Sequence, residues 1–376
     1  MLCRSRWSLR LKAVAAPLPI AEPSPRDGER SRRQHLLDLD AGSLRDRLAQ
    51  WGEKPFRAKQ IIAAIYERGL RDFDAMSDLP KSLRTRLAGE FELFRGREAA
   101  VQTSDDGTDK LLVEWPDGGR IECVLLRDGH RRSICVSSQV GCAMGCVFCA
   151  SGLDGVDRNL TRGEILEQML RLQSRLADGE RLSHIVMMGM GEPLANLPSV
   201  LAALSVAKDP AGLGISPRRI TISTVGLPPA IDKLASSGVP YNLAVSLHAP
   251  NDELRTQLVP VNKNIGVDAV MAAADRYFDA CGRRLTFEYV LLGGVNDDEL
   301  CAKQLAGLLR RRNAMLNVIP YNPVAGLPYQ TPSPRAIERF RQVLEQGGVN
   351  VQFRHRKGSE INAACGQLRR SRDPRN

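Results

Sequence analysis

Three cysteines lie within eight residues of one another, in the spacing CxxxCxxC: Cys142, Cys146 and Cys149. They follow an apolar stretch typical of a strand, so the spacing predicts a loop on which three thiolates can ligate a metal centre. A closed zinc site needs a fourth ligand, and this loop holds none, so zinc would require a distant partner such as Cys135 or His184. A [4Fe–4S] cluster held by three cysteines instead leaves one iron open for a ligand, and we favour this interpretation.

Polar residues end several other apolar stretches. Gly191 and Glu192 follow 185–190, where a glycine permits close backbone approach and a carboxylate can accept from an ammonium group. Ser223 and the run 246–248 end two further stretches, so we expect them to face one mouth of a barrel. The structural alternatives are a glycine turn with a solvated glutamate and a buried, hydrogen-bonded histidine.

Cys365 lies near the C-terminus among small residues that leave a thiol accessible. Nearby cations lower the pKa of a thiol and favour the nucleophilic thiolate. The flanking cations are Arg354, Arg356, Lys357, Arg369, Arg370 and Arg372. The cysteines that lack any such context, and that we expect to be structural, are Cys3, Cys123, Cys281 and Cys301.

Stretches rich in branched apolar residues alternate with amphipathic ones from Ser133 onward. The alternation predicts an α/β fold with a parallel sheet, as a full or partial (βα) barrel whose function gathers at the carboxyl ends of the strands. The predicted strands are 134–140, 185–190, 219–225, 243–248, 285–291, 316–321 and 349–353, and the predicted helices are 164–176, 267–280, 298–310 and 335–344.

Two smaller regions precede this core. Helical periodicity predicts three helices, the first beginning at Ser43 with Ser43 and Asp46 in capping-box spacing. Short apolar runs separated by Asp-Gly turns then predict a β-meander. The predicted domains are a flexible basic tail (1–35), a helical accessory domain (36–98), a β-meander linker (99–132), the core (133–368) and a basic C-terminal tail (369–376).

The composition of the 376 residues excludes several classes of protein. The longest apolar runs fall far short of the roughly 20 residues that a membrane-spanning helix needs. An odd count of nine cysteines and no signal-peptide core favour a reducing, cytoplasmic setting over a disulfide scaffold. The net charge of +10 suits a phosphate-rich partner. The acid-free first 20 residues fit a disordered extension or, as the weaker alternative, an organellar transit peptide.

CxxxCxxC with an aromatic, Phe148, before its last cysteine resembles the radical S-adenosylmethionine superfamily. Further motifs, in the same order along the chain, resemble one branch of it, the RlmN family of adenine-C2 RNA methyltransferases, over roughly residues 44–368. The nearest relatives of that family methylate adenine C8. The matching motifs are 56–58 with 60–61, 135–142, 158–161, 188–194, 246–249, 317–323 and 363–368.

The resemblance implies a [4Fe–4S] cluster on the three loop cysteines and two S-adenosylmethionine molecules per turnover. The residues that it implies for cofactor contact are Gly191, Glu192, Ser223, Ser246, Leu247, His248 and Asn322. It further implies that Cys365 carries a methyl group, that Cys135 resolves the RNA adduct through a transient disulfide with Cys365, and that Glu122 accepts a proton.

The implied substrates are 23S ribosomal RNA in the peptidyl transferase region and the adenosine beside the anticodon in certain transfer RNAs. The target base must leave its stack to reach a buried site. We expect a bacterial cytoplasmic monomer that takes electrons from a donor such as flavodoxin or ferredoxin. Adenine-C8 methylation and a non-catalytic, zinc-stabilised RNA-binding protein are the alternatives.

Overall fold

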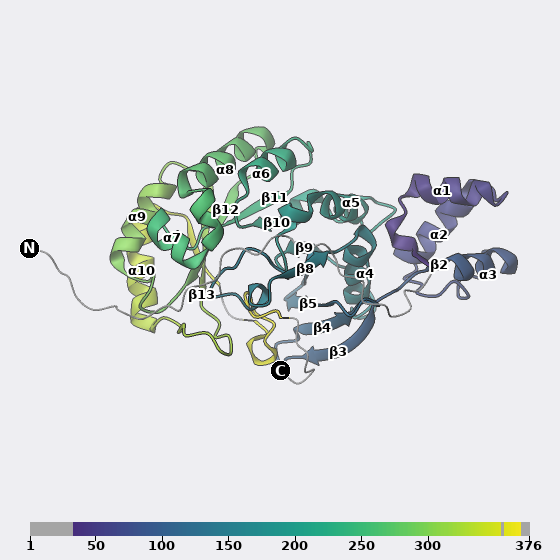
Figure 1. Cartoon of the computed structure of the whole chain (residues 1–376), viewed down its shortest axis with the longest axis horizontal. Helices are drawn as coiled ribbons and strands as arrows, with labels where there is room; N and C mark the ends of the chain where they lie inside the picture. Colours follow the sequence, from purple (N-terminus) through teal and green to yellow (C-terminus); the bar gives the residue numbers. More distant parts are fainter. Residues whose placement is uncertain (1–32, 355–356, 370–376) are drawn as a thin grey trace, which may run out of the picture.

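A ten-stranded sheet forms the frame of the computed structural model, which describes residues 33–354 and 357–369 (Figure 1). The strand order is β14-β13-β12-β11-β10-β9-β6-β5-β4-β3, and the pairs from β14 to β6 are parallel, whereas β6 to β3 form an antiparallel meander. The strands are β3 (Arg97–Thr103), β4 (Asp109–Glu114), β5 (Arg120–Asp128), β6 (Arg131–Cys135), β9 (His184–Met187), β10 (Ile220–Thr224), β11 (Asn242–Ser246), β12 (Leu285–Leu291), β13 (Ala314–Pro320) and β14 (Val351–Phe353).

Helices cover the outer face of the parallel strands, as a right-handed strand-helix-strand succession requires. Tyr289 of β12, for example, packs its ring against Phe340 of α10, with centroids 5.5 Å apart. The partial (βα) barrel predicted from the alternation is thus confirmed. Its helices are α4 (Arg162–Gln173), α5 (Leu197–Lys208), α6 (Pro228–Ala235), α7 (Asp252–Leu258), α8 (Val267–Cys281), α9 (Glu299–Leu309) and α10 (Pro334–Gln346).

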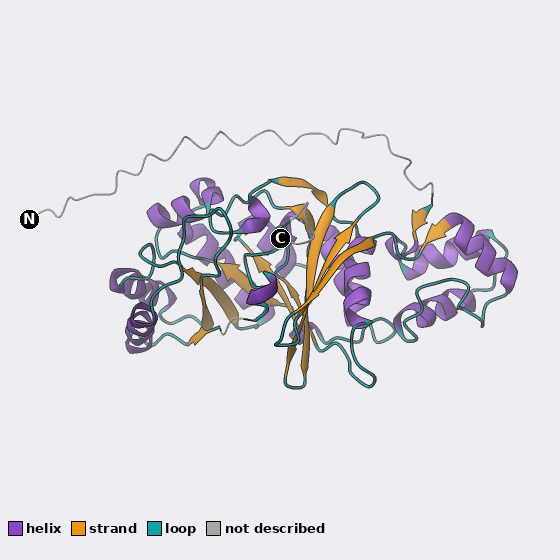
Figure 2. Cartoon of the chain, turned by 90° about the horizontal axis from the view of Figure 1, so that it is seen from below, coloured by secondary structure: helices purple, strands orange, loops and turns teal. Residues whose placement is uncertain are grey.

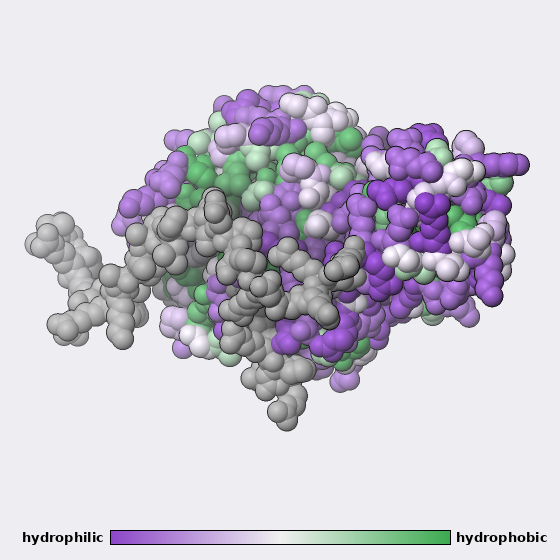
Figure 3. All heavy atoms as spheres, turned by 45° about the vertical axis from the view of Figure 1, so that its right-hand side comes forward, coloured by the Kyte–Doolittle hydropathy of each residue, from purple (hydrophilic) through white to green (hydrophobic). Residues whose placement is uncertain are grey.

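A small helical domain lies at one end of the molecule, beyond α4 (Figures 1 and 2). It contains α1 (Ala41–Gln50), α2 (Phe56–Tyr66), α3 (Lys81–Glu90) and a parallel pair of short strands, β1 (Gln34–His35) and β2 (Phe91–Glu92). The face of this domain that is seen in Figure 3 is largely hydrophilic. Buried contacts join it to α4: Asp38 accepts from Gly163 N–H at 2.7 Å, and His35 Nε2 lies 3.3 Å from Glu167 Oε2.

Three details differ from the sequence prediction. The expected strand 134–140 is split, because the chain leaves the main sheet after β6 and forms β7 (Gln139–Gly141), which pairs with β8 (Val156–Asn159). The predicted cap at Ser43 is wrong: Asp40 caps α1 and accepts from Ser43 N–H at 2.7 Å. The meander continues the main sheet through β5 and β6.

Some predictions remain untested. The domain boundaries are still predictions, and most of the predicted tails, 1–32 and 370–376, lie outside the described residues, as do Cys3 and Arg356. Within the described residues, no helix is both long and apolar enough to span a bilayer.

Candidate active site

The register of the sheet brings the predicted polar residues onto one face. Successive residues of a strand point to opposite faces, and directly paired residues point to the same one. The outer face is packed against helices, so the other face is the interior of the partial barrel. By this argument the interior face carries Glu122, Cys135, Ser223 and Ser246. The pairs that establish it are Val124–Cys135, Cys135–Val186, Val186–Thr221, Ser223–Ala244 and Ser246–Glu288.

The cysteine loop begins at Gly141, where β7 ends. Gly141 has φ +81°, and a Cβ there would collide with Gly155 O, so only glycine fits. Phe148 then packs edge-on against His248, with centroids 4.8 Å apart at 75°. The loop is therefore anchored on the interior face, next to the residue that follows β11.

The three loop thiols lie close enough to influence one another. Burial raises the pKa of each, to about 12 for Cys142, and the pKa of Cys146 is raised further by Cys149 and Cys142. Three thiolates in this place would repel one another unless a cationic centre bound them. The described residues contain no group of three Cys, His, Asp or Glu side chains placed to hold one metal ion. A [4Fe–4S] cluster binds its cysteines through different irons, so the thiols need not converge on a single point.

Glu192 lies beside these thiols in a backbone cradle. Its Oε1 accepts from Leu194 N–H at 2.9 Å and its Oε2 from Val225 N–H at 2.8 Å, which leaves further acceptor capacity on each oxygen. Burial raises the pKa of Glu192 to about 7. Gly191, at φ +99°, lies so close to Gln139 that a Cβ would approach Gln139 Cβ to 2.6 Å. The glycine thus permits a close approach to Gln139, and its contact with a cofactor stays a prediction.

The segment after β11 is fixed by buried hydrogen bonds. His248 has φ +59°, and its Nδ1 accepts from Val290 N–H at 3.0 Å, so the neutral ring carries its proton on Nε2. Burial lowers the pKa of His248 to about 3. Leu247 points its side chain into the core, and its carbonyl accepts from Arg255 at 3.0 Å, so contact with a cofactor would come from its backbone.

The C-terminal segment returns across the interior to the cysteine loop, shown yellow in Figure 1. Ala150 N–H donates to Gly366 O at 2.8 Å, and Ser151 Oγ donates to Leu368 O at 2.7 Å. Asn322 Nδ2 donates to Cys365 O at 3.2 Å, while its buried Oδ1 has no hydrogen-bond partner among the residues described. The contacts place the exposed Cys365 beside the loop and leave one amide oxygen of Asn322 to accept from a ligand.

Cys365 and Cys135 are brought together around one guanidinium. Arg354 Nη1 donates to Cys365 Sγ at 3.8 Å, and the guanidinium also interacts electrostatically with Cys135. Burial raises the pKa of Cys135 to about 12, with a further contribution from Cys365. The described cysteines are all free thiols, so the Cys135–Cys365 disulfide named in the sequence prediction is not formed in this structure.

Glu122, for which the resemblance implies a proton-acceptor role, is buried on β5. Its Oε1 lies 2.8 Å from Lys110 Nζ, and its Oε2 accepts from Arg369 N–H at 2.8 Å. Burial raises its pKa, and Lys110 opposes that shift. Lys110 also donates to Asn362 O at 3.4 Å, so the pair anchors the segment that carries Cys365.

Sequence reasoning missed Lys110 and Arg255. Arg255 is fully buried and donates to the carbonyls of Ser246, Leu247 and Val225, joining the ends of two strands. Neither residue lies in a chemical motif, and strand register or tertiary packing alone reveals its role.

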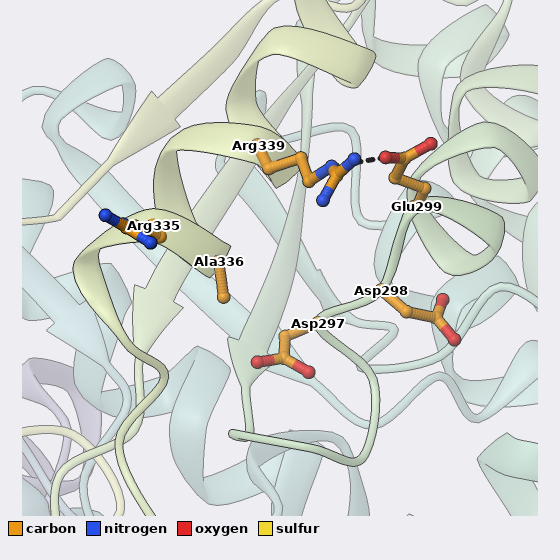
Figure 4. Close-up of a pocket in the computed structure, with 6 residues that line it drawn as sticks. All are labelled: Asp297, Asp298, Glu299, Arg335, Ala336 and Arg339. Atoms are coloured by element: carbon orange, nitrogen blue, oxygen red, sulfur yellow. Dashed lines mark ion pairs between the residues drawn. The ribbon is translucent and has the colours of Figure 1, made fainter.

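A pocket on the outer surface is a different feature (Figure 4). Its carboxylates serve local structure: Asp298 caps α9 by accepting from Cys301 N–H at 2.7 Å, and Asp297 accepts from Gly294 N–H at 2.9 Å. Glu299 pairs with Arg339. The lining residues are Asp297, Asp298, Glu299, Arg335, Ala336 and Arg339.

Comparison with known proteins agrees with this geometry. Residues 136–302 match the radical SAM superfamily, and residues 34–93 match the N-terminal domain of ribosomal RNA large subunit methyltransferases. A protein of Rhodopirellula baltica, named "Probable dual-specificity RNA methyltransferase RlmN", is 68% identical over 94% of this chain and 96% of its own. A protein of the same name from Symbiobacterium thermophilum is 47% identical over 94% and 95% of the two chains.

A solved structure matches almost the whole fold. The radical SAM methyltransferase of Sphaerobacter thermophilus superposes with a TM-score of 0.87 at 44% identity, covering 89% of this chain and 99% of its own. The partial barrel and the helical domain therefore occur together in a solved relative. The chain belongs to the RlmN family of radical S-adenosylmethionine RNA methyltransferases.

Proposed function

We propose that the enzyme methylates C2 of an adenosine in the peptidyl transferase region of 23S rRNA and of the adenosine beside the anticodon in certain tRNAs. The observation that carries this proposal is the pairing of Cys365 and Cys135 around Arg354, next to the cysteine loop. Adenine C2 is an electron-poor sp² carbon, so a methyl group cannot reach it by simple displacement. A thiol that first carries the methyl group provides a radical route.

Cys142, Cys146 and Cys149 would hold the cluster, and Glu192, Ser223, Ser246, Leu247, His248, Asn322 and Gly191 would contact S-adenosylmethionine. When bound, the cluster and S-adenosylmethionine would supply one-electron chemistry. That chemistry removes a hydrogen atom from the methyl group on Cys365 and later accepts one electron from the modified base. Asn322 supports this role, because its buried Oδ1 lacks a partner among the described residues while its Nδ2 holds the Cys365 backbone.

Cys365 first takes a methyl group from one S-adenosylmethionine, as a new S–C bond forms and the sulfonium S–C bond breaks. After hydrogen removal with a second molecule, its methylene carbon bonds to C2. Loss of one electron and of the C2 proton, for which Glu122 is the proposed acceptor, leaves a neutral thioether. The Cys135 thiolate then attacks Cys365 Sγ, an S–S bond forms as the S–C bond breaks, and the carbon takes a proton. Two electrons from a donor such as flavodoxin or ferredoxin restore the thiols.

The test is to incubate the reconstituted enzyme with rRNA and tRNA transcripts, digest them, and locate the new methyl group by mass spectrometry against adenosine standards. We expect 2-methyladenosine at a single rRNA position. Methyl groups found only at C8 would replace this proposal with the chemistry of the neighbouring branch. A colourless, zinc-containing protein that binds RNA without methyl transfer would favour the non-catalytic alternative.

A further inference from the structure

Glu288 is a buried carboxylate that the functions above leave unused. It lies on β12, 4% exposed. Its Oε2 accepts from Asn317 Nδ2 at 2.7 Å, but its buried Oε1 has no hydrogen-bond partner among the described residues. An unpaired carboxylate oxygen is costly to bury, so such an atom indicates a place where a donor from a ligand completes the structure.

The neighbours of Glu288 settle where its side chain points. Tyr289 faces outward, onto Phe340 of α10, whereas Val290 packs against the apolar cluster that contains Phe148 of the cysteine loop. Ser246 pairs directly with Glu288 from β11, and Asn317 does so from β13. The carboxylate therefore faces the interior, on the same side of the sheet as Cys135.

Arg354 connects Glu288 with the reactive thiol. It lies two residues beyond Gln352, which pairs with Asn317, so it belongs to the same face of the sheet. Its guanidinium interacts electrostatically with Glu288 and donates to Cys365 Sγ at 3.8 Å. The three groups thus form a row in the order acceptor, donor and thiol.

We propose that Glu288 and Arg354 recognise the adenine that Cys365 methylates, with Glu288 accepting from the exocyclic N6 amino group and Arg354 donating to the adjacent ring nitrogen. This inference rests on the proposed function. Along an edge of adenine an amino donor, a ring-nitrogen acceptor and a reactive carbon follow one another, in the same order as Glu288, Arg354 and Cys365. Guanine would set its O6 acceptor against the carboxylate, which disfavours it.

The same order of groups occurs on both edges of adenine, as N6–N1–C2 and as N6–N7–C8. The row therefore selects adenine over guanine and leaves the choice of carbon to other contacts. S-adenosylmethionine is the competing donor for Glu288, because Ser246, which we propose as a contact of that cofactor, pairs directly with Glu288. The contact between Arg354 and Cys365 Sγ favours the base, because in the proposed function the carbon carried by that sulfur bonds to the base.

The test compares RNAs of one sequence that carry adenosine, inosine or purine ribonucleoside, which lacks N6, at the target position. Their binding to cluster-loaded protein is measured by fluorescence anisotropy. Wild type should prefer adenosine over purine ribonucleoside by about 10- to 100-fold, the usual effect of one hydrogen bond to a charged group. Glu288→Gln should lose most of this preference and bind inosine better, because its amide can donate to O6. Glu338→Gln, exposed on α10, is the matched control and should behave as wild type.

Two parallel measurements separate the possible failures: affinity for S-adenosylmethionine and the mass of the Cys365 peptide. An unchanged base preference in Glu288→Gln would overturn the inference. If that variant loses affinity for S-adenosylmethionine and nothing else, Glu288 belongs to the cofactor site. Arg354→Lys tests the pair independently if Glu288→Gln does not fold, and it too should weaken the preference for adenosine. Wild type that binds adenosine selectively but never methylates it would overturn the proposed function and not this inference.

Discussion

The thiols of Cys142, Cys146 and Cys149 have pKa values raised first by burial and, for Cys142 and Cys146, also by neighbouring loop thiols, so they are costly to ionise without a cationic centre. Replacing any one of them with Ala should abolish the brown chromophore and the bound iron, because two thiolates cannot hold a cluster that needs three. Iron analysis and visible spectra of anaerobically purified protein check this. Cys281→Ala, on α8, is the control and should keep its iron. Full iron content in a loop variant would refute the assignment.

Cys135→Ala should stall the enzyme after it has bonded to RNA. The variant keeps Cys365 and the cysteine loop, but lacks the nucleophile proposed to attack Cys365 Sγ. Protein purified from cells should therefore carry RNA that survives denaturation and that maps to Cys365 by peptide mass. The Cys135→Ala, Cys365→Ala double variant should carry none. Normal turnover by the single variant would show that Cys135 is only a buried strand residue.

Residues in local motifs could be predicted from the sequence, and their partners could not. CxxxCxxC and the Gly191-Glu192 turn could be recognised from their spacing in the sequence. The resemblance to a known family identified Cys135, Glu122 and Cys365. Nothing along the chain indicates that Lys110 pairs with Glu122, because that contact follows from the register of β4 on β5. The free oxygen of Glu288 likewise depends on which face of β12 is interior.

At the scale of elements, strands and helices could be predicted from the sequence where the apolar pattern was long. The predicted strands at 285–291 and 316–321 match β12 and β13 closely, whereas α5, α6 and the short α7 were not among the predicted helices. Both α5 and α6 have proline in their first turn, at Leu197-Pro198 and Pro228-Pro229, which in sequence resembles a turn. The strand 134–140 was predicted too long: Ser137 and Ser138 lie at the junction between β6 and β7, where the chain leaves the main sheet although both residues are buried.

The start of α1 offers a test at this scale. Asp40 accepts from Ser43 N–H, so Asp40→Ala should lower the free energy of unfolding by about 1 kcal/mol, as the loss of a helix cap does. Ser43→Ala should change it by only about a few tenths of a kcal/mol, within the range of an exposed site. Chemical denaturation followed by circular dichroism compares the two. A larger loss for Ser43→Ala would restore the cap that the sequence pattern predicted.

At the scale of the whole molecule, the helical domain is joined to the barrel through buried polar groups. Glu167 of α4 accepts from the backbone N–H of Arg95 and Gly96, both at 2.9 Å, and pairs with Arg171 at 2.6 Å. His35 lies against the same carboxylate. Helical periodicity predicted an accessory domain before the core, but these contacts join residues some 70 to 130 positions apart, so no local pattern could indicate them.

His35 should make the stability of this junction depend on pH. Burial lowers its pKa from 6.5 to about 4, so between these values the unfolded chain binds a proton that the folded chain excludes. The contribution of His35 is therefore complete above pH 6.5 and is lost as the pH falls towards 4. The melting temperature of wild type should fall more between pH 7.5 and 5.0 than that of His35→Gln, which cannot titrate there. His130→Gln, exposed in the turn after β5, is the control and should follow wild type. Equal pH dependence of wild type and His35→Gln would mean that the junction tolerates a charged imidazole, with Glu167 compensating for its burial.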